Sequence, residues 1–111
     1  MKTSLSELRA RIPGAASVQW PEGERYALGF SQGCMSLGYY APRGHDPQQP
    51  HRRDEIYIVQ SGSAELIIDG VCHPCRAGDA LFVGAGVAHR FERISADFAT
   101  WVVFCGAAKT D

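Results

Sequence analysis

The sequence lacks a strong excess of charge of either sign and lacks any long apolar run. Lys and Arg total 11 and Asp and Glu total 12 among 111 residues, which gives a formal net charge of −1. Proteins that bind nucleic acid or membrane surfaces through general electrostatics carry a clear basic excess, so we expect neither partner. No apolar run is long enough to span a bilayer, and the first residues, MKTSLSELRARIPG, have no continuous apolar segment typical of a secretory signal. We therefore expect a cytoplasmic location.

Helical periodicity is also scarce. It occurs only in TSLSELRARIPG near the N-terminus, where Ser4 and Glu7 have the spacing of a capping box and Pro13-Gly14 would end the helix. No helical pattern of ten residues follows residue 14, which disfavours a fold of alternating strands and helices.

Short apolar or alternating segments, each bounded by Gly, Pro or Asp, make up most of the remaining chain. Asp69-Gly70 is typical of a type I′ hairpin turn, and Gly62 suits another tight connection. This pattern predicts an all-β domain, a sandwich or barrel of antiparallel strands. The expected division is an N-terminal helix and linker over 1–25, a β-barrel over 26–105 and a flexible tail over 106–111. The expected strands lie at 26–32, 34–40, 55–60, 63–68, 71–73, 80–83, 88–92 and 98–104.

The four cysteines give no disulfide framework or zinc motif. Cys34 and Cys105 stand in strand-like contexts and are predicted to be small buried residues. Cys72 and Cys75 form a C-x-x-C sequence, but they occur in an expected hairpin rather than at a strand-to-helix junction, and no second Cys/His pair accompanies them. We interpret them as ordinary strand cysteines, and a redox role is the weaker alternative.

The stretch PQQPHRRDEIYIVQSG places polar functional groups at the start of an apolar strand. Pro50 excludes a helix interior and biases Gln49 towards an extended conformation. On an extended strand Gln49, His51 and Glu55 share one face, because they have equal parity. Polar side chains that point into a small barrel need partners, and a metal ion can supply one.

A third candidate ligand lies in GDALFVGAGVAHRFE, where GAG turns the chain back and His89 begins the returning strand. We expect this strand to lie in the same sheet as its neighbours and His89 to face the same interior as His51. Two imidazoles and the Glu55 carboxylate form a ligand set with open positions, as in non-haem iron enzymes. The same donors also suit Mn, Ni, Co or Zn.

These two stretches resemble the two-part motif of the cupin superfamily, G-x5-H-x-H-x3,4-E-x6-G followed by G-x5-P-x-G-x2-H-x3-N. His51, Glu55 and Gly62 match the first part in register, and Gly78, Gly86 and His89 match the second. The resemblance implies a small single-domain cupin barrel of the double-stranded β-helix or jelly-roll type, covering about residues 26–105. It also implies a divalent metal ion inside the barrel, with His51, Glu55 and His89 as ligands.

The sequence departs from the motif at four positions, of which Gln49 matters most. Gly44 is one residue closer than the pattern asks, Gly84 replaces the proline, and Arg93 replaces the asparagine. Gln49 stands where the family has its first histidine. Its carbonyl oxygen can complete a four-ligand set, or it can leave an open triad of two histidines and one carboxylate, or the site can be degraded and hold metal loosely.

Other polar residues near the motifs have weaker cases. His45 is a poorly spaced substitute for the missing histidine, and His73 is expected to be an exposed hairpin residue. Arg52 and Arg53 can steer an anionic ligand or can simply be solvated. The aromatic residues expected to form core or pocket lining are Tyr57, Phe91, Phe98, Trp101 and Phe104.

The resemblance favours a metal-dependent enzyme of dioxygenase type that acts on a small organic molecule, although isomerases and decarboxylases share the same site. The alternative is a non-enzymatic module that binds or senses a small molecule. Small cupins often pair through strands of the barrel, so a homodimer is the expected assembly. Apolar edge strands that need cover agree with this.

Overall fold

The computed structural model describes residues 1–106 and confirms the predicted all-β fold with one short N-terminal helix. Helix α1 (Leu5–Arg9) precedes eight strands, all close to the expected positions. The largest difference is β5, which continues to Arg76 beyond the expected end at residue 73. The strands are β1 (Tyr26–Gln32), β2 (Met35–Tyr40), β3 (Asp54–Ser61), β4 (Ser63–Ile68), β5 (Val71–Arg76), β6 (Ala80–Val83), β7 (His89–Glu92) and β8 (Ala99–Cys105).

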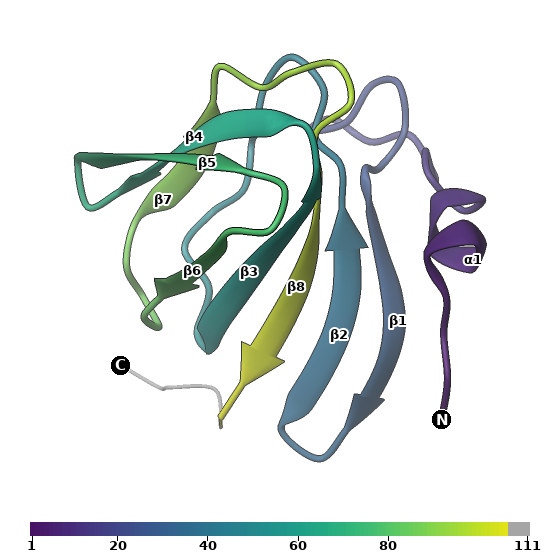
Figure 1. Ribbon diagram of the computed structural model, residues 1–111. Helices are drawn as coiled ribbons and strands as arrows, with labels where there is room; N and C mark the ends of the chain where they lie inside the picture. Colours follow the sequence, from purple (N-terminus) through teal and green to yellow (C-terminus); the bar gives the residue numbers. More distant parts are fainter. Residues whose placement is uncertain (107–111) are drawn as a thin grey trace.

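Two antiparallel sheets face each other across the core (Figure 1). The larger sheet has the order β1-β2-β8-β3-β6, and the smaller one has the order β5-β4-β7. The chain crosses from one sheet to the other between β3 and β4, between β5 and β6, between β6 and β7, and between β7 and β8. Consecutive strands therefore often lie in opposite walls, which is the jelly-roll type of β-barrel.

The core follows from alternation along the strands. In β3, Glu55, Tyr57 and Val59 are buried, whereas Ile56 and Ile58 between them are exposed. Successive side chains of a strand point to opposite faces, so the first three enter the barrel and the other two lie outside. The interior cluster also takes residues from the smaller sheet, among them Ala64, Leu66, Cys75 and Phe91.

The hairpin between β4 and β5 has the predicted turn. Asp69 and Gly70 both have positive φ, of 48° and 80°, as the two central residues of a type I′ turn require. This turn fixes the register of β4 against β5, in which Ile68 opposes Val71.

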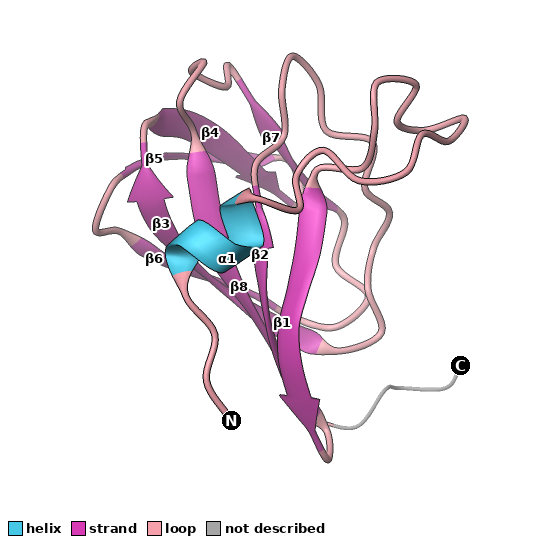
Figure 2. Cartoon of the chain, turned by 90° about the vertical axis from the view of Figure 1, so that its right-hand side faces the viewer, coloured by secondary structure: helices cyan, strands magenta, loops and turns pink. Residues whose placement is uncertain are grey.

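Helix α1 covers part of the outer face of the larger sheet (Figure 2). The Ser4 hydroxyl accepts a hydrogen bond from the Glu7 amide at 3.2 Å, which confirms the N-terminal half of the capping pattern. Leu8 is fully buried against Ala27 and Tyr39. The helix ends at Arg9, before Pro13, and partly buried Ile12 packs on the same cluster from the following segment.

A glycine on β2 makes room for an aromatic ring inside the barrel. A Cβ atom at Gly38 would lie 2.1 Å from the Tyr26 hydroxyl oxygen and 2.4 Å from the nearest ring carbon, Cζ. The Tyr26 side chain from β1 therefore lies across the backbone of β2, and Gly38 is the residue type that permits this approach.

The prediction of a buried Cys34 was wrong. Cys34 is exposed in the turn between β1 and β2. The first strand ends at Gln32 as predicted, but the turn at Gly33, with φ of 59°, includes Cys34, so the second strand begins at Met35 rather than at residue 34. Cys105 is half-buried at the end of β8.

No helix within residues 1–106 is long and apolar enough to cross a membrane. The flexible tail expected over 106–111 lies, apart from Gly106, outside the described residues.

Candidate metal centre

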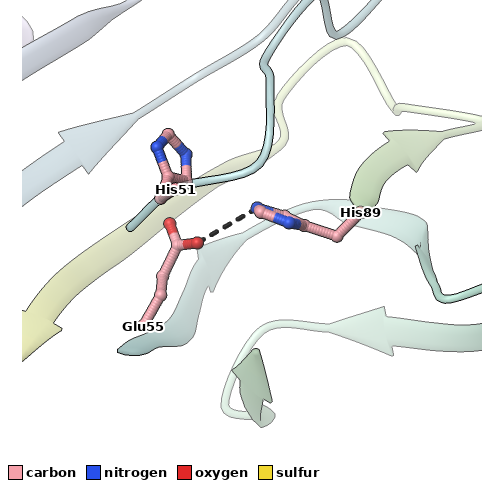
Figure 3. Close-up of side chains that lie close together, drawn as sticks. All are labelled: His51, Glu55 and His89. Atoms are coloured by element: carbon pink, nitrogen blue, oxygen red, sulfur yellow. Dashed lines mark ion pairs between the residues drawn. The ribbon is translucent and has the colours of Figure 1, made fainter. Parts of the chain in front are cut away.

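Three predicted ligands meet inside the barrel (Figure 3). Each of His51, Glu55 and His89 offers one donor atom, and these three atoms all lie within 4.8 Å of one another. Glu55 and His89 are buried, and His51 is half-buried. The structure thus brings together the imidazoles and the carboxylate that the sequence motifs indicated.

His51 does not belong to a strand, contrary to the parity interpretation. Strand β3 begins at Asp54, and His51 lies in the preceding loop. The Gly86 amide donates to the His51 carbonyl at 2.6 Å, and the Ala85 amide donates to the Asp54 carboxylate at 3.0 Å. These two bonds fasten the His51 loop to the Gly84–Ala88 turn, so the loop reaches over the barrel and directs His51 inward.

His89 comes from the opposite sheet, not from the sheet of β3. Strand β7 pairs with β4 in the smaller sheet, with Ile68 opposite His89. The Gly84–Ala88 turn carries the chain from β6, which pairs with β3, across to β7. Ligands from both walls therefore converge, which no single-strand pattern can show.

Glu55 and His89 present two buried atoms without a hydrogen-bond partner among the described residues, Oε1 of Glu55 and Nε2 of His89. The two atoms face each other at 3.0 Å, and their side chains are only 2% and 1% exposed. His89 Nδ1 lies 2.9 Å from the Val87 carbonyl, which accepts only, so Nδ1 carries the proton and Nε2 of a neutral ring is a lone pair. Two buried acceptor atoms at this distance need either a proton or a metal ion between them.

The histidine pKa values differ in direction. Burial lowers the pKa of His51, which favours the neutral ring that a metal requires. Burial alone would also lower the pKa of His89, but hydrogen bonding to Glu55 and to the Val87 carbonyl raises it above the ordinary value. A proton on His89 Nε2 can therefore bridge to Glu55 in the absence of metal. A metal ion bound at the same place would replace that proton.

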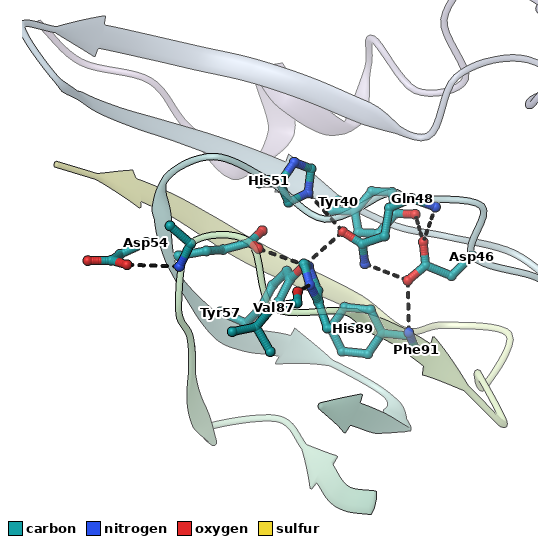
Figure 4. A network of polar contacts seen from close by, with 11 residues as sticks. Tyr40, Asp46, Gln48, His51, Asp54, Tyr57, Val87, His89 and Phe91 are labelled. Atoms are coloured by element: carbon teal, nitrogen blue, oxygen red, sulfur yellow. Dashed lines mark hydrogen bonds and ion pairs between the residues drawn. The ribbon is translucent and has the colours of Figure 1, made fainter. Parts of the chain in front are cut away.

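The residue that places an amide beside His51 is Gln48 (Figure 4). Its Oε1 lies 3.1 Å from His51 Nε2 and accepts from the Tyr57 hydroxyl at 3.1 Å. Its Nε2 donates to Asp46 Oδ2 at 2.6 Å. Because a carboxylate only accepts and a neutral phenol in this position donates, this network orients the amide with its oxygen towards His51.

Asp46 anchors this arrangement. It is 9% exposed and accepts from the Tyr40 hydroxyl, the Gln48 amide at 3.2 Å and the Phe91 amide at 2.8 Å. The Phe91 bond ties the loop before β3 to β7, the strand that begins with His89. Sequence reasoning missed both Asp46 and Gln48, and only the adjacency of Gln48 to Gln49 hinted at either.

Gln49 is exposed and lies at the mouth of the pocket. The preceding residue therefore has the amide oxygen next to His51, whereas the motif alignment pointed to Gln49. The loop conformation decides between these neighbours, since the strand parity used for Gln49 does not apply before residue 54.

The weaker candidates lie elsewhere. His45 is exposed and stacks against Trp20, with ring centroids 5.3 Å apart, and His73 is exposed on β5 as expected. Arg52 is exposed and Arg53 half-buried, and neither lines the pocket. Of the expected aromatic residues, Tyr57 and Phe104 line the pocket, Phe91 and Phe98 lie in the core, and Trp101 lies by α1.

The C-x-x-C sequence occupies one strand. Cys72 is exposed and Cys75 is buried on β5, because residues three apart on a strand point to opposite faces. Burial raises the pKa of the Cys75 thiol, whose sulfur donates to the Ala64 carbonyl. A raised pKa and opposed side chains are unsuited to thiol–disulfide exchange between the two.

The third ligand, His89, lines an adjoining hollow. A cavity of about 390 Å³ opens beside the other two ligands, His51 and Glu55. Its floor includes His51, Glu55 and Tyr57, and its wall contains several aromatic rings. A small molecule in this cavity has direct access to the candidate metal ligands.

The fold and the interior histidine and carboxylate cluster define a small β-barrel with a candidate metal site. The family model of the cupin domain matches residues 36–105, and the chain belongs to this family.

Three relatives illustrate the match. An uncharacterized protein of Streptomyces coelicolor is 42% identical over 72 residues, covering 63% of this chain and 69% of that protein. A conserved barrel domain protein from Salinispora arenicola has a TM-score of 0.63 and 24% identity, over 74% of this chain and 75% of that one. The crystal structure of a proposed mannose-6-phosphate isomerase from Ralstonia eutropha has a TM-score of 0.60 and 25% identity, over 74% and 83%.

Proposed function

We propose that this cupin binds one divalent metal ion through His51, Glu55 and His89 and uses it as an enzyme of dioxygenase type on a small organic molecule. The observation that supports this most directly is the pair of buried lone pairs on Glu55 and His89, 3.0 Å apart, with His51 beside them. A divalent ion held there would act as a Lewis acid for a ligand oxygen and, if it is iron, would allow reaction with O2.

We further propose that Gln48, rather than Gln49, supplies the fourth protein donor. Its oxygen already lies 3.1 Å from His51 Nε2, and Asp46 holds the amide in that orientation. A neutral amide oxygen is a weaker donor than imidazole, so this set favours metals that accept oxygen ligands, such as iron or manganese.

The tyrosines around the site can orient a bound molecule by donating hydrogen bonds, but they are not bases that remove protons. Burial raises the pKa of Tyr26 to about 12 and holds the pKa of Tyr57 well above 10. At neutral pH both phenols keep their protons. The Tyr57 hydroxyl donates its proton to Gln48 Oε1, so Tyr26 is the phenol that can donate to a bound oxygen atom. Tyr57 and Val102 are buried at the inner end of the pocket, and together they shield the Glu55 carboxylate from bulk water.

The scarcity of proton-transfer groups in the pocket supports a non-enzymatic binding role as the second candidate. Apart from the metal ligands, the groups in the pocket that titrate are the three tyrosines 26, 40 and 57 and the exposed carboxylate of Glu24. A pocket with so few groups for proton transfer also suits a module that binds a small molecule without converting it.

Metal content tests the common part of both proposals. Protein made without a histidine tag and reconstituted under reducing conditions should hold about one metal per chain by elemental analysis. His89→Ala should lose that metal, whereas the matched control His73→Ala, which changes an exposed histidine, should retain it. Equal metal content in both variants would contradict the proposed site.

Oxygen uptake then separates the two roles. With iron(II)-loaded protein and catechol as a probe, an oxygen electrode should record consumption above that of the His89→Ala variant. Binding of catechol without oxygen consumption would favour the non-enzymatic role.

A further inference from the structure

The wall of the 390 Å³ cavity beside His51 and Glu55 is aromatic and acidic. Besides His51, Glu55 and Tyr57, the cavity is lined by the rings of Trp20, Tyr26, Tyr40 and Phe104, by Glu24, and by uncharged proline, glutamine and valine residues. Within residues 1–106, no lysine or arginine contributes to this lining. From this distribution we propose that the site selects small aromatic ligands whose outer end is neutral or cationic and rejects those whose outer end is anionic. The inference builds on the proposed metal site, which would hold the inner end.

Three arginines around the cavity are engaged elsewhere. Arg90 lines the adjoining hollow that shares Pro47 and Gln48 with the cavity, and its Nε donates to Glu92 Oε2 at 2.8 Å. The Arg25 Nε donates to the Ala41 carbonyl at 2.8 Å, and Arg43 Nη1 donates to the carbonyls of Ala41, Pro42 and Phe98, the last at 2.7 Å. Arg25 and Arg43 line other surface hollows and not this cavity. They are therefore not available to neutralise a phosphate or carboxylate at the mouth.

The linker before β1 builds one side of the cavity. Its turn is closed by hydrogen bonds from the Ser17 amide to the Trp20 carbonyl at 2.9 Å and from the Trp20 amide to the Ser17 hydroxyl at 3.0 Å. The Trp20 ring lies edge-on to Tyr40, with centroids 6.2 Å apart, and it also contacts the His45 ring, with centroids 5.3 Å apart. Trp20 is thus a fixed wall, and Glu24 follows it at the start of the barrel.

This lining discriminates by charge. Aromatic faces attract cations and planar rings, and a carboxylate at the mouth strengthens the attraction for a cation. An anionic group would lose its hydration, meet Glu24 and find no basic partner. The end of the cavity beside the metal ligands has the opposite charge preference, because an oxygen atom that binds the metal there can be negatively charged. Only the outer part of the ligand is selected against negative charge. This contrasts with the phosphate named in the substrate of the proposed mannose-6-phosphate isomerase, a protein similar in fold.

A matched set of catechols tests the proposal with zinc-loaded protein, which avoids oxidation. Dopamine, 4-ethylcatechol and 3,4-dihydroxyphenylacetate share the metal-binding head and differ mainly in the charge of the outer end, which is +1, 0 and −1. By isothermal titration calorimetry, dopamine and 4-ethylcatechol should each bind about tenfold or more tightly than 3,4-dihydroxyphenylacetate, since tenfold is about 1.4 kcal/mol. Equal or tighter binding of the anionic member overturns the proposal.

Two glutamates of the linker provide a matched pair of variants. Glu24→Gln should reduce the preference for dopamine over 4-ethylcatechol by about threefold or more while leaving 4-ethylcatechol unchanged. Glu22→Gln should not, because Glu22 lines a different hollow. An equal effect of the two variants contradicts the assigned role of Glu24.

Metal-free protein distinguishes this inference from the metal site itself. Tyramine, 4-ethylphenol and 4-hydroxyphenylacetate have no chelating pair, and the same charge order is expected for them without zinc. If zinc does not bind but the charge order holds, the proposed function fails and the present inference stands. If zinc binds and the charge order is absent or reversed, the inference fails. Absence of binding by all six compounds also overturns it.

Discussion

The side-chain amide of Gln48 beside His51 offers the sharpest test of the metal site, because substitutions of Gln48 and of its neighbour Gln49 are expected to have different effects on metal binding. The side chain of Gln48 makes three contacts, to His51 Nε2 at 3.1 Å, to the Tyr57 hydroxyl at 3.1 Å and to Asp46 at 2.6 Å. Gln49 is exposed at the mouth. Gln48→Leu removes the contacts at nearly constant volume, and Gln49→Leu is the matched control.

Gln48→Leu should weaken metal binding by at least about 10-fold, because removing even a group that only orients a metal ligand costs about 10- to 100-fold in affinity. It should also lower the free energy of unfolding of the metal-free protein by about 1–3 kcal/mol, because the fully buried Tyr57 loses the acceptor for its hydroxyl. Gln49→Leu should stay within about 0.5 kcal/mol, as exposed substitutions do.

Metal affinity can be measured by competition with a chromophoric chelator, and stability by urea unfolding of the metal-free variants. With cobalt(II), the visible spectrum reports directly on the donor set, so Gln48→Leu should change its shape and not only its intensity. A larger loss of affinity in Gln49→Leu than in Gln48→Leu would refute the reasoning. A gain of affinity in Gln49→His would likewise show that the loop can present residue 49 to the metal.

Three further predictions concern the barrel. Gly38→Ala should lower the free energy of unfolding by about 1–3 kcal/mol and change the affinity for small molecules, because the added methyl group must displace the Tyr26 ring. Thermal melts measure the first effect, and titration calorimetry measures the second. Arg93→Asn should raise the free energy of unfolding, measured by urea melts, by about 0.5–1 kcal/mol. Arg93 has a φ of 50°, which asparagine tolerates better, and its exposed ion pair with Glu65 contributes little to stability. No gain in stability would mean that the ion pair outweighs the backbone strain. The homodimer expected from the sequence stays a prediction. If the outer face of the larger sheet forms the dimer interface, Phe82→Glu, which changes a residue 61% exposed on that face, should yield a monomer by analytical ultracentrifugation. An unchanged assembly would place the interface elsewhere.

Patterns with a short physical range were enough to predict the fold. Alternation in EIYIVQS, the Asp69-Gly70 turn and the Ser4 cap each depend on neighbouring residues only, so the sequence alone indicated the strands and the short helix. The spacing of the two motifs likewise indicated His51, Glu55 and His89. The Cys34 prediction failed because apolar context does not show where a hairpin reverses.

Only the tertiary structure decided how these residues meet. His89 reaches the site from the smaller sheet, and the loop before β3 presents Gln48 where the motif pointed to Gln49. That choice depends on Asp46, whose partners Tyr40 and Phe91 are 6 and 45 residues away along the chain. Trp20 closes the cavity from a linker that carries no motif. The amino-acid sequence alone determined the identity of three candidate ligands. The direction of a side chain in a loop is set by contacts distant in sequence, so only the fold determined that Gln48 lies beside His51 and that no lysine or arginine among residues 1–106 lines the pocket.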